Sequence, residues 1–284
     1  MKTLRAYFEI TKPKIVAMVF VTLAIGFFMA PGPHNLLQLL NALIGTGLAS
    51  AGAAALNHCL ERDTDRLMER TKNRPIPTGV IRPIEALVFG VFLVLVGVFY
   101  LELIVNLLTA FLVLLTAFLY VLVYTPLKRL SWLNTFVGAI PGALPPMIGW
   151  AAASGSVGFG AYILFLILFA WQHPHFYALA WMFREDYARG GLQMLPVIDP
   201  TGRRTMFHIL FYALFLFVIS LVPVYLGMAG RTYFFGVMIL GLVMLGISIE
   251  LALSKSLADA KKLFRASLIY FPVLLVLVIV DARF

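Results

Sequence analysis

The amino-acid sequence predicts an all-α integral membrane protein with about nine transmembrane helices and a cytoplasmic N-terminus. The chain has 284 residues, of which 62% are hydrophobic and only 12% are charged, and its mean hydropathy is +0.95. A soluble domain needs a polar surface that this composition does not provide. Apolar segments long enough to cross a hydrocarbon core of about 30 Å recur along the whole chain. We therefore expect one membrane domain over residues 1–284 and no separate soluble domain.

Nine apolar segments account for most of the chain. They lie at about 15–30, 36–57, 85–103, 106–124, 134–153, 160–182, 206–227, 233–253 and 266–281. Of the 22 Lys and Arg residues, all but Arg231 and Arg283 fall before the first span or in the loops after the second, fourth, sixth and eighth spans. Cytoplasmic loops are the ones enriched in Lys and Arg. The net charge of +9 therefore indicates topology and not nucleic-acid binding.

The connections between these segments differ in what they predict. The second span ends in a long polar loop, about 58–84, and a tight link near Glu102 and Asn106 joins the third span to the fourth. The fifth span contains GAIPGALPPMIGW (138–150), in which Pro and Gly disfavour a continuous helix. This segment is either a kink that allows helix packing or part of a cavity wall. The sixth span is followed by a second long polar loop, about 183–205.

Three oxygen-bearing side chains recur at every fourth position where the second span meets its loop. At about 100° per residue, Asn57, Glu61 and Asp65 are each displaced by only about 40° around a helix from the last, whereas Asp63 points elsewhere. Asn57 lies inside the apolar limit of the span, where polar residues are functional candidates. The pattern predicts a face that holds a divalent cation through oxygen ligands. The alternative is a solvated loop whose acids pair with Arg62, Arg66, Arg70, Lys72 and Arg74.

A second group of acids lies at the end of the sixth span, in WQHPHFYALAWMFREDYARGGLQMLP (171–196), where Glu185 and Asp186 are adjacent. If the two polar loops meet in space, carboxylates from both would hold Mg²⁺ while Arg and Lys bind the remaining charge of a polyphosphate. The single Cys59 excludes an internal disulfide.

Five motifs follow one another in order and cover most of the chain. They are Asn57-x-x-x-Glu61-x-x-x-Asp65 continuing to Arg74-Pro75, Tyr124-Thr-Pro-Leu-Lys128-Arg129, the stretch 138–150, Trp171-Gln-x-Pro-His175-Phe, and Asp186-Tyr-x-Arg-x-Gly-x-x-Met-Leu-Pro196. Together they resemble the UbiA superfamily of membrane prenyltransferases, and within it the branch that modifies haem. Two positions depart from the family pattern: Glu61 stands where Asp is usual, and Gly190 stands four residues after Asp186 where relatives of the quinone pathway have Asp.

This resemblance implies a bundle of helices around a central cavity and a reaction on haem. A farnesyl group would pass from farnesyl diphosphate to a vinyl group of haem b, which is a substrate, and water would add to the product. Mg²⁺ is the implied cofactor. The implied metal ligands are Glu61, Asp65 and Asp186, with Asn57 in support. The implied diphosphate-binding residues are Lys128, Arg66, Arg70, Arg74 and Arg129.

The resemblance also implies haem contacts at His175 and Tyr124. The ring of Tyr124 is a candidate for stabilising an allylic cation, and its alternative role is an anchor at the membrane interface. His173 and His175 lie about 200° apart on a helix, so at most one of them ligates the haem iron.

Three other functions remain open on the sequence. A related enzyme with an aromatic acceptor, such as a quinone or chlorophyll precursor, would share the first acid motif. A transporter would bind its ions near the midplane, whereas these acids lie at the membrane edge. A subunit that only binds haem would need no diphosphate site. We expect the bacterial inner membrane, an active site on the cytoplasmic side and, by resemblance, partnership with haem-pathway or oxidase-assembly proteins.

Overall fold

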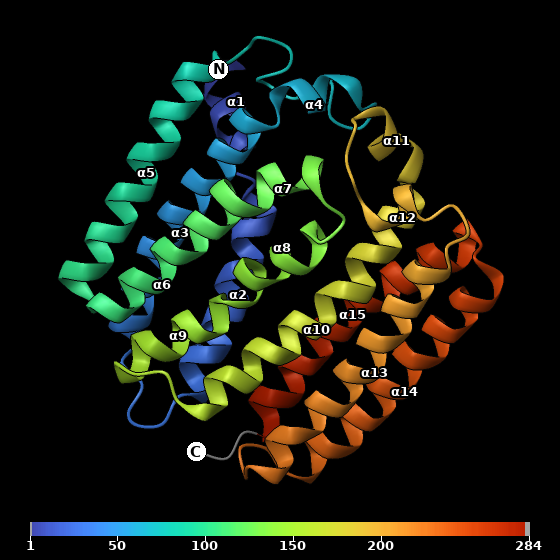
Figure 1. Ribbon diagram of the computed structural model, residues 1–284. Helices are drawn as coiled ribbons and strands as arrows, with labels where there is room; N and C mark the ends of the chain where they lie inside the picture. Colours follow the sequence, from blue (N-terminus) through green and yellow to red (C-terminus); the bar gives the residue numbers. More distant parts are fainter. Residues whose placement is uncertain (1, 282–284) are drawn as a thin grey trace.

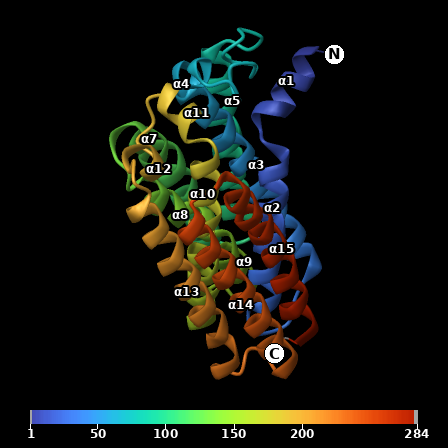
Figure 2. The same ribbon diagram turned by 90° about the vertical axis from the view of Figure 1, so that its right-hand side faces the viewer.

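The computed structural model describes residues 2–281, and the regular elements of this range are all helical (Figure 1). Its first half contains α1 (Lys2–Ile10), α2 (Pro13–Met29), α3 (Leu36–Leu60), α4 (Arg62–Leu67), α5 (Pro83–Ile104), α6 (Leu107–Phe118), the π-helix η1 (Leu119–Tyr124) and α7 (Thr125–Leu130). Its second half contains α8 (Asn134–Ala143), α9 (Pro145–Ser154), α10 (Phe159–Met182), α11 (Arg184–Arg189), α12 (Leu195–Ile198), α13 (Arg203–Tyr225), α14 (Arg231–Ser254) and α15 (Leu257–Asp281). The short helices α4 and α11 lie together at one end of the long ones (Figure 2).

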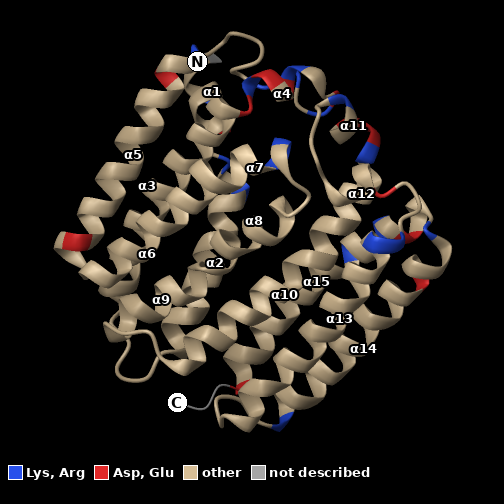
Figure 3. Ribbon diagram, in the orientation of Figure 1, with Lys and Arg blue, Asp and Glu red and all other residues tan. Residues whose placement is uncertain are grey.

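The helices confirm the predicted fold class. Within the described chain, 8 helices are long and apolar enough to cross a membrane, or 9 if α1 and α2, which meet at a bend of 42°, form one span. Each of the nine predicted segments overlaps one of these helical stretches. Many of the charged residues lie along the rim formed by α1, α4, α7 and α11 (Figure 3). That this rim faces the cytoplasm stays a prediction, and Arg283 lies outside the described residues.

The predicted link between the third and fourth spans is tight because one side chain closes it. Asn106 caps α6 by accepting a hydrogen bond from the backbone N–H of Thr109 at 2.8 Å. Its Nδ2 donates to the carbonyl of Ala151 at 3.0 Å, which ties the link to the end of α9. A capping side chain of this kind satisfies one of the free N–H groups at the start of a helix.

The fifth span is interrupted at one residue, Leu144, within its run of Pro and Gly residues, although Asn134–Ser154 still forms one helical span. Helix α8 ends at Ala143 and α9 begins at Pro145, and Gln172 of α10 donates from Nε2 to the carbonyl of Ala139 at 3.1 Å. The broken span also packs very closely on α2: a Cβ added at Gly149 would lie 1.9 Å from the carbonyl oxygen of Leu23. Only glycine permits that approach.

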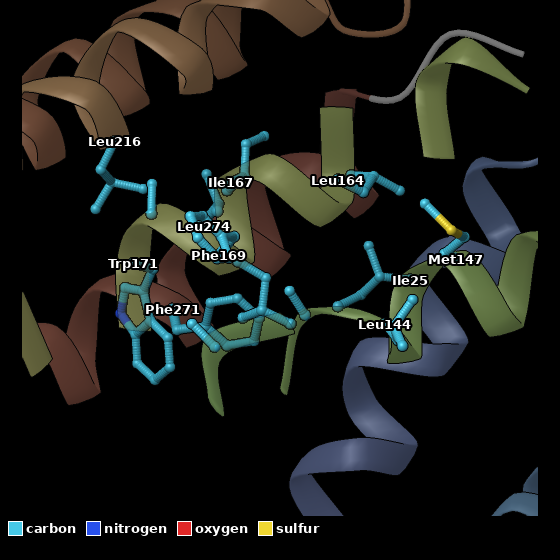
Figure 4. Close-up of a cluster of buried hydrophobic side chains, with 14 of the residues drawn as sticks. Ile25, Leu144, Met147, Leu164, Ile167, Phe169, Trp171, Leu216, Phe271 and Leu274 are labelled. Atoms are coloured by element: carbon cyan, nitrogen blue, oxygen red, sulfur yellow. The ribbon is translucent and has the colours of Figure 1, made fainter. Parts of the chain in front are cut away.

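The apolar core packs around α10 (Figure 4). The α10 side chains Leu164, Ile167, Phe169 and Trp171 lie between Ile25, Leu144 and Met147 on one side and Leu216, Phe271 and Leu274 on the other. Helix α10 therefore connects α2 and α9 with α13 and α15.

Candidate functional site

A cavity of about 640 Å³ extends from the loop after α3 into the bundle, as the central-cavity prediction requires. Its lining includes Glu61 and Arg74 at the loop end and Thr46 and Ile148 from the interior of the spans. A larger groove, about 1280 Å³, lies between α1 and α5, but it is open and almost wholly apolar. The polar chemistry is therefore in the first cavity.

The predicted polar face persists although the helix that carries it is interrupted. Helix α3 ends at Leu60, and Glu61 adopts φ −88° and ψ 0° before α4 begins. The i to i−4 backbone bonds nevertheless continue through the break, from Glu61 N–H to the Asn57 carbonyl at 2.9 Å and from Asp65 N–H to the Glu61 carbonyl at 2.7 Å. Each of the three side chains meets a cation.

Asn57 is fully buried and bridges three helices. Its Oδ1 accepts a hydrogen bond from the ammonium of Lys12, and its Nδ2 donates to Oγ1 of Thr125 at 2.9 Å. Lys12 lies between α1 and α2 with the left-handed φ of 51°, and its Nζ also donates to the hydroxyl of Tyr120 at 3.3 Å. The bend between α1 and α2 thus brings a cation into the cavity.

Glu61 and Lys128 form a mostly buried ion pair, with Nζ 2.6 Å from Oε1. Lys128 also lies over the ring of Tyr124, at 4.5 Å from its centroid. Burial alone would raise the pKa of Glu61, but the positive charges of Lys128 and Lys12 outweigh it and lower that pKa to about 2. Tyr124 ends the π-helical turn η1 that precedes α7, and such turns are frequent at functional sites.

Asp65 and Arg74 form the third pair. Nη1 of Arg74 donates to both carboxylate oxygens of Asp65, at 2.9 and 2.8 Å, and the Asp65 side chain is fully buried. Thr71 closes the turn by donating from Oγ1 to the Asp65 carbonyl at 2.9 Å. Burial raises the pKa of Asp65, and the Arg74 guanidinium opposes that rise.

Asp186 makes its contacts outside the cavity lining, and its expected role as a metal ligand stays a prediction. Its oxygens accept hydrogen bonds from the backbone N–H groups of Glu69 and Arg70, at 2.8 and 3.4 Å, and from Arg189 at 2.7 Å. It therefore fastens the loop after α4 to α11 and does not line the cavity. In the described chain no three His, Cys, Asp or Glu side chains are grouped so that they could hold a metal ion.

The four arginines expected to bind diphosphate separate into two pairs. Arg70 and Arg74 line the cavity, and Arg70 also packs over the rings of Phe183 and Tyr187. Arg66 and Arg129 are exposed and lie outside the cavity lining, so the geometry gives their expected role no support.

The two histidines of α10 diverge, as their spacing predicts. His175 lines the cavity between the rings of Trp171 and Phe264, and its Nδ1 hydrogen-bonds Oγ of Ser267 at 2.8 Å. His173 instead stacks on Tyr212 with ring centroids 3.6 Å apart. Of the two, only His175 is placed to meet a substrate in this cavity.

Sequence reasoning missed Lys12, Tyr120 and Thr125 as parts of the site. Lys12 belongs to a cation-rich segment before the first span, where a topological role explains it equally well. The following Pro13 disfavours a helical backbone at Lys12 and so indicates a helix boundary, but it does not indicate the left-handed conformation of Lys12. Tyr120 precedes the Tyr124–Lys128 motif and carries no pattern of its own, and Thr125 lies inside that motif but was given no separate role.

The donor set fits a divalent cation that is shared with a phosphorylated substrate. Mg²⁺ is usually bound through one or two carboxylates together with substrate phosphates and water, and not by an all-protein cage. Glu61 and Asp65 both line the cavity and supply two such carboxylates. Lys12, Arg74 and Lys128 lie beside them and would meet the phosphate oxygens.

A helical membrane bundle whose cavity carries paired acids and cations is the architecture of a membrane prenyltransferase. The family model described as the UbiA prenyltransferase family matches residues 18–271, and this chain belongs to that family. Among its curated relatives, a protoheme IX farnesyltransferase of Solibacter usitatus is 45% identical, with 98% of this chain and 99% of the relative covered. One of Salinibacter ruber is 43% identical over 97% of this chain and 98% of the relative.

Solved structures share the fold. The digeranylgeranylglyceryl phosphate synthase structure superposes with a TM-score of 0.83 at 19% identity, covering 99% of this chain and 98% of that chain. A UbiA homolog of Archaeoglobus fulgidus bound to GPP and Mg²⁺ has a TM-score of 0.66 at 16% identity and covers 96% of this chain and 99% of that chain.

Proposed function

We propose that this chain transfers a farnesyl group from farnesyl diphosphate to a vinyl group of haem b, forming haem O. The full-length similarity to protoheme IX farnesyltransferases supports this acceptor. The observation that carries the chemistry is the row of three acid or amide side chains, each paired with a cation that lines a mainly apolar cavity.

The cations bind the diphosphate in this proposal. Lys12, Arg74 and Lys128 come from three separate segments and point into one cavity, so they would surround a leaving group that carries several negative charges. Arg70 lies at the edge of the same cavity. Donors that are already in place where charge develops lower the barrier without reorganisation.

Glu61 and Asp65 hold the divalent cation, with Asn57 orienting Lys12 beside them. The Archaeoglobus homolog bound to GPP and Mg²⁺ supports Mg²⁺ as that ion. When bound, the cation neutralises charge on the departing diphosphate. Because each carboxylate already pairs with Lys128 or Arg74, these ion pairs must open when metal and diphosphate bind.

The rest of the cavity keeps water from the allylic cation and presents the acceptor. Its wall on α10 and α15 contains Trp171, His175, Phe176 and Phe271, which suit a flat aromatic macrocycle. The His175–Ser267 hydrogen bond through Nδ1 leaves Nε2 free for haem. Tyr124 lies beside Lys128, and the face of its ring would stabilise the allylic cation.

The acceptor is tested by giving the purified protein farnesyl diphosphate, Mg²⁺ and an equal mixture of haem b and 4-hydroxybenzoate. Mass spectrometry of the extracted products should show farnesylated, hydrated haem. Farnesylated benzoate with unchanged haem would replace the proposal by an aromatic-acceptor prenyltransferase. No product from either acceptor would refute prenyl transfer to both classes.

We also propose that the charged rim faces the cytoplasm of a bacterial inner membrane. The bias of Lys and Arg toward this rim supports it. A cysteine replacing the exposed Lys72 should react with a membrane-impermeant maleimide in inverted membrane vesicles and not in intact spheroplasts. The reverse pattern would place the rim outside. Partnership with haem-pathway or oxidase-assembly proteins remains part of the proposal.

A further inference from the structure

The interior arm of the cavity carries a row of small side chains along one helix. Ala53, Ala49 and Thr46 of α3 all line it. They succeed one another at spacings of four and three residues, so they occupy one face of the helix. The row begins below Asn57, where the cations gather, and runs toward the middle of the bundle.

The rise of the helix gives the depth of each of these residues below Asn57. At 1.5 Å per residue, Ala53 lies about 6 Å below Asn57, Ala49 about 12 Å and Thr46 about 16 Å. On the opposite wall α2 gives a similar depth, because Thr22, the deepest lining residue of that helix, lies ten residues beyond Lys12, or about 15 Å.

The inner end of the cavity reaches that level. Thr22, Thr46, Val113 and Ile148 come from four helices, and each is buried. Beyond them the bundle is packed: Leu23, Phe27 and Leu144 belong to the apolar core, and Gly26 and Gly149 let α2 and α9 touch. A chain that descends the arm therefore meets a floor.

The depth matches three isoprene units. An extended chain advances about 1.2 Å per bond, the value implied by the reach of an extended polypeptide. On this scale the main chain of a geranyl group is about 8 Å long, that of a farnesyl group about 13 Å and that of a geranylgeranyl group about 18 Å. A farnesyl tail would pass Ala49 and end above Thr46, and a geranylgeranyl tail would collide with the floor.

We propose that the Ala53–Ala49–Thr46 face of α3, closed by Thr22, Val113 and Ile148, measures the prenyl tail and selects farnesyl diphosphate. This inference rests on the proposed function and adds the residues that set its donor specificity. The small side chains of Ala49 and Ala53 leave room for the third and second isoprene units, and the floor excludes a fourth.

The test is to measure kcat/KM for geranyl, farnesyl and geranylgeranyl diphosphate with haem b in the A49F and A53F variants. A49F should lower the preference for farnesyl over geranyl at least about tenfold, because a single misplaced methylene already costs that much in an apolar pocket. A53F should reject both. The ratio between substrates within one variant does not depend on how much protein folds.

A control variant keeps the result specific. Ile44 is exposed on the same helix and does not line the cavity, so I44F adds a phenyl ring without obstructing the arm. An unaltered donor preference in A49F and A53F, with wild-type transfer intact, would overturn the inference and leave the proposed function standing. Loss of wild-type transfer to haem would instead overturn the proposed function.

Discussion

Replacing Lys128 with Met should have opposite effects on the two ligands of the site. The Lys128 ammonium lies 2.6 Å from Glu61, and the two side chains are only 16% and 13% exposed. Mg²⁺ added alone must therefore displace a buried cation from its ligand. The diphosphate, in contrast, gains from the same ammonium. We expect K128M to bind Mg²⁺ alone more tightly and a farnesyl thiodiphosphate analogue less tightly.

The magnitude follows from the bond that is removed. A hydrogen bond to a charged group contributes about 1.5–3 kcal/mol, which corresponds to roughly 10- to 150-fold in affinity. We expect a gain of that order for Mg²⁺ alone at pH 8 and a loss of similar size for the analogue. The control is R129M, because Arg129 is the adjacent cation but is exposed and outside the cavity.

The pH dependence of Mg²⁺ affinity tests the role of Lys128 in a second way. In the wild type, Lys128 and Lys12 hold the pKa of Glu61 near 2 against the effect of burial. Without Lys128, burial has the greater influence and that pKa rises. Glu61 then gains a proton at a higher pH than in the wild type, so the fall of Mg²⁺ affinity with falling pH should begin at a higher pH in K128M than in the wild type.

Isothermal titration in detergent micelles, with each ligand alone and then together, measures these constants. Weaker binding of Mg²⁺ alone by K128M at pH 8, or the same change in R129M, would contradict the view that Lys128 occupies a metal ligand in the free enzyme.

Three further predictions concern other parts of the site. D65N, which keeps the side-chain shape but removes the charge that meets Arg74, should lower the rate of haem farnesylation by at least about 100-fold in a single-turnover assay; retention of a tenth of the rate would remove Asp65 from the site. H175F preserves the packing between Trp171 and Phe264 and should abolish the shift of the haem Soret band on binding, while binding of the diphosphate analogue is unchanged. Loss of both ligands would show a structural role. D186N removes the charge that accepts hydrogen bonds from the Glu69 and Arg70 amides, so amide hydrogen exchange in residues 68–71 should accelerate. Mg²⁺ affinity should change less than about threefold, and a loss of Mg²⁺ affinity of about 100-fold would support Asp186 as a metal ligand.

The spans and the first polar face were predictable because they depend on short-range regularities. Apolar length and the distribution of cations locate the helices, and a four-residue spacing keeps Asn57, Glu61 and Asp65 together even where α3 breaks after Leu60. The break itself has no clear sequence signal. It does not disturb the face because the i to i−4 bonds pass through Glu61.

The partners of that face were harder to predict because they come from distant segments. Lys12 reaches Asn57 across 45 positions and Lys128 reaches Glu61 across 67, and spacing alone does not reveal such pairs. The contacts of Asp186 were equally hard to predict. Its motif does not indicate that this acid holds two backbone amides and an arginine.

The most direct test of the account is an experimental structure of the protein with farnesyl thiodiphosphate, Mg²⁺ and haem b. It should show the diphosphate contacted by Lys12, Arg74 and Lys128, the metal on Glu61 and Asp65, and the farnesyl tail ending above Thr46. Haem should lie against the wall that contains Trp171 and His175. A diphosphate bound away from these cations, with the Glu61–Lys128 and Asp65–Arg74 pairs still closed, would contradict the central claim.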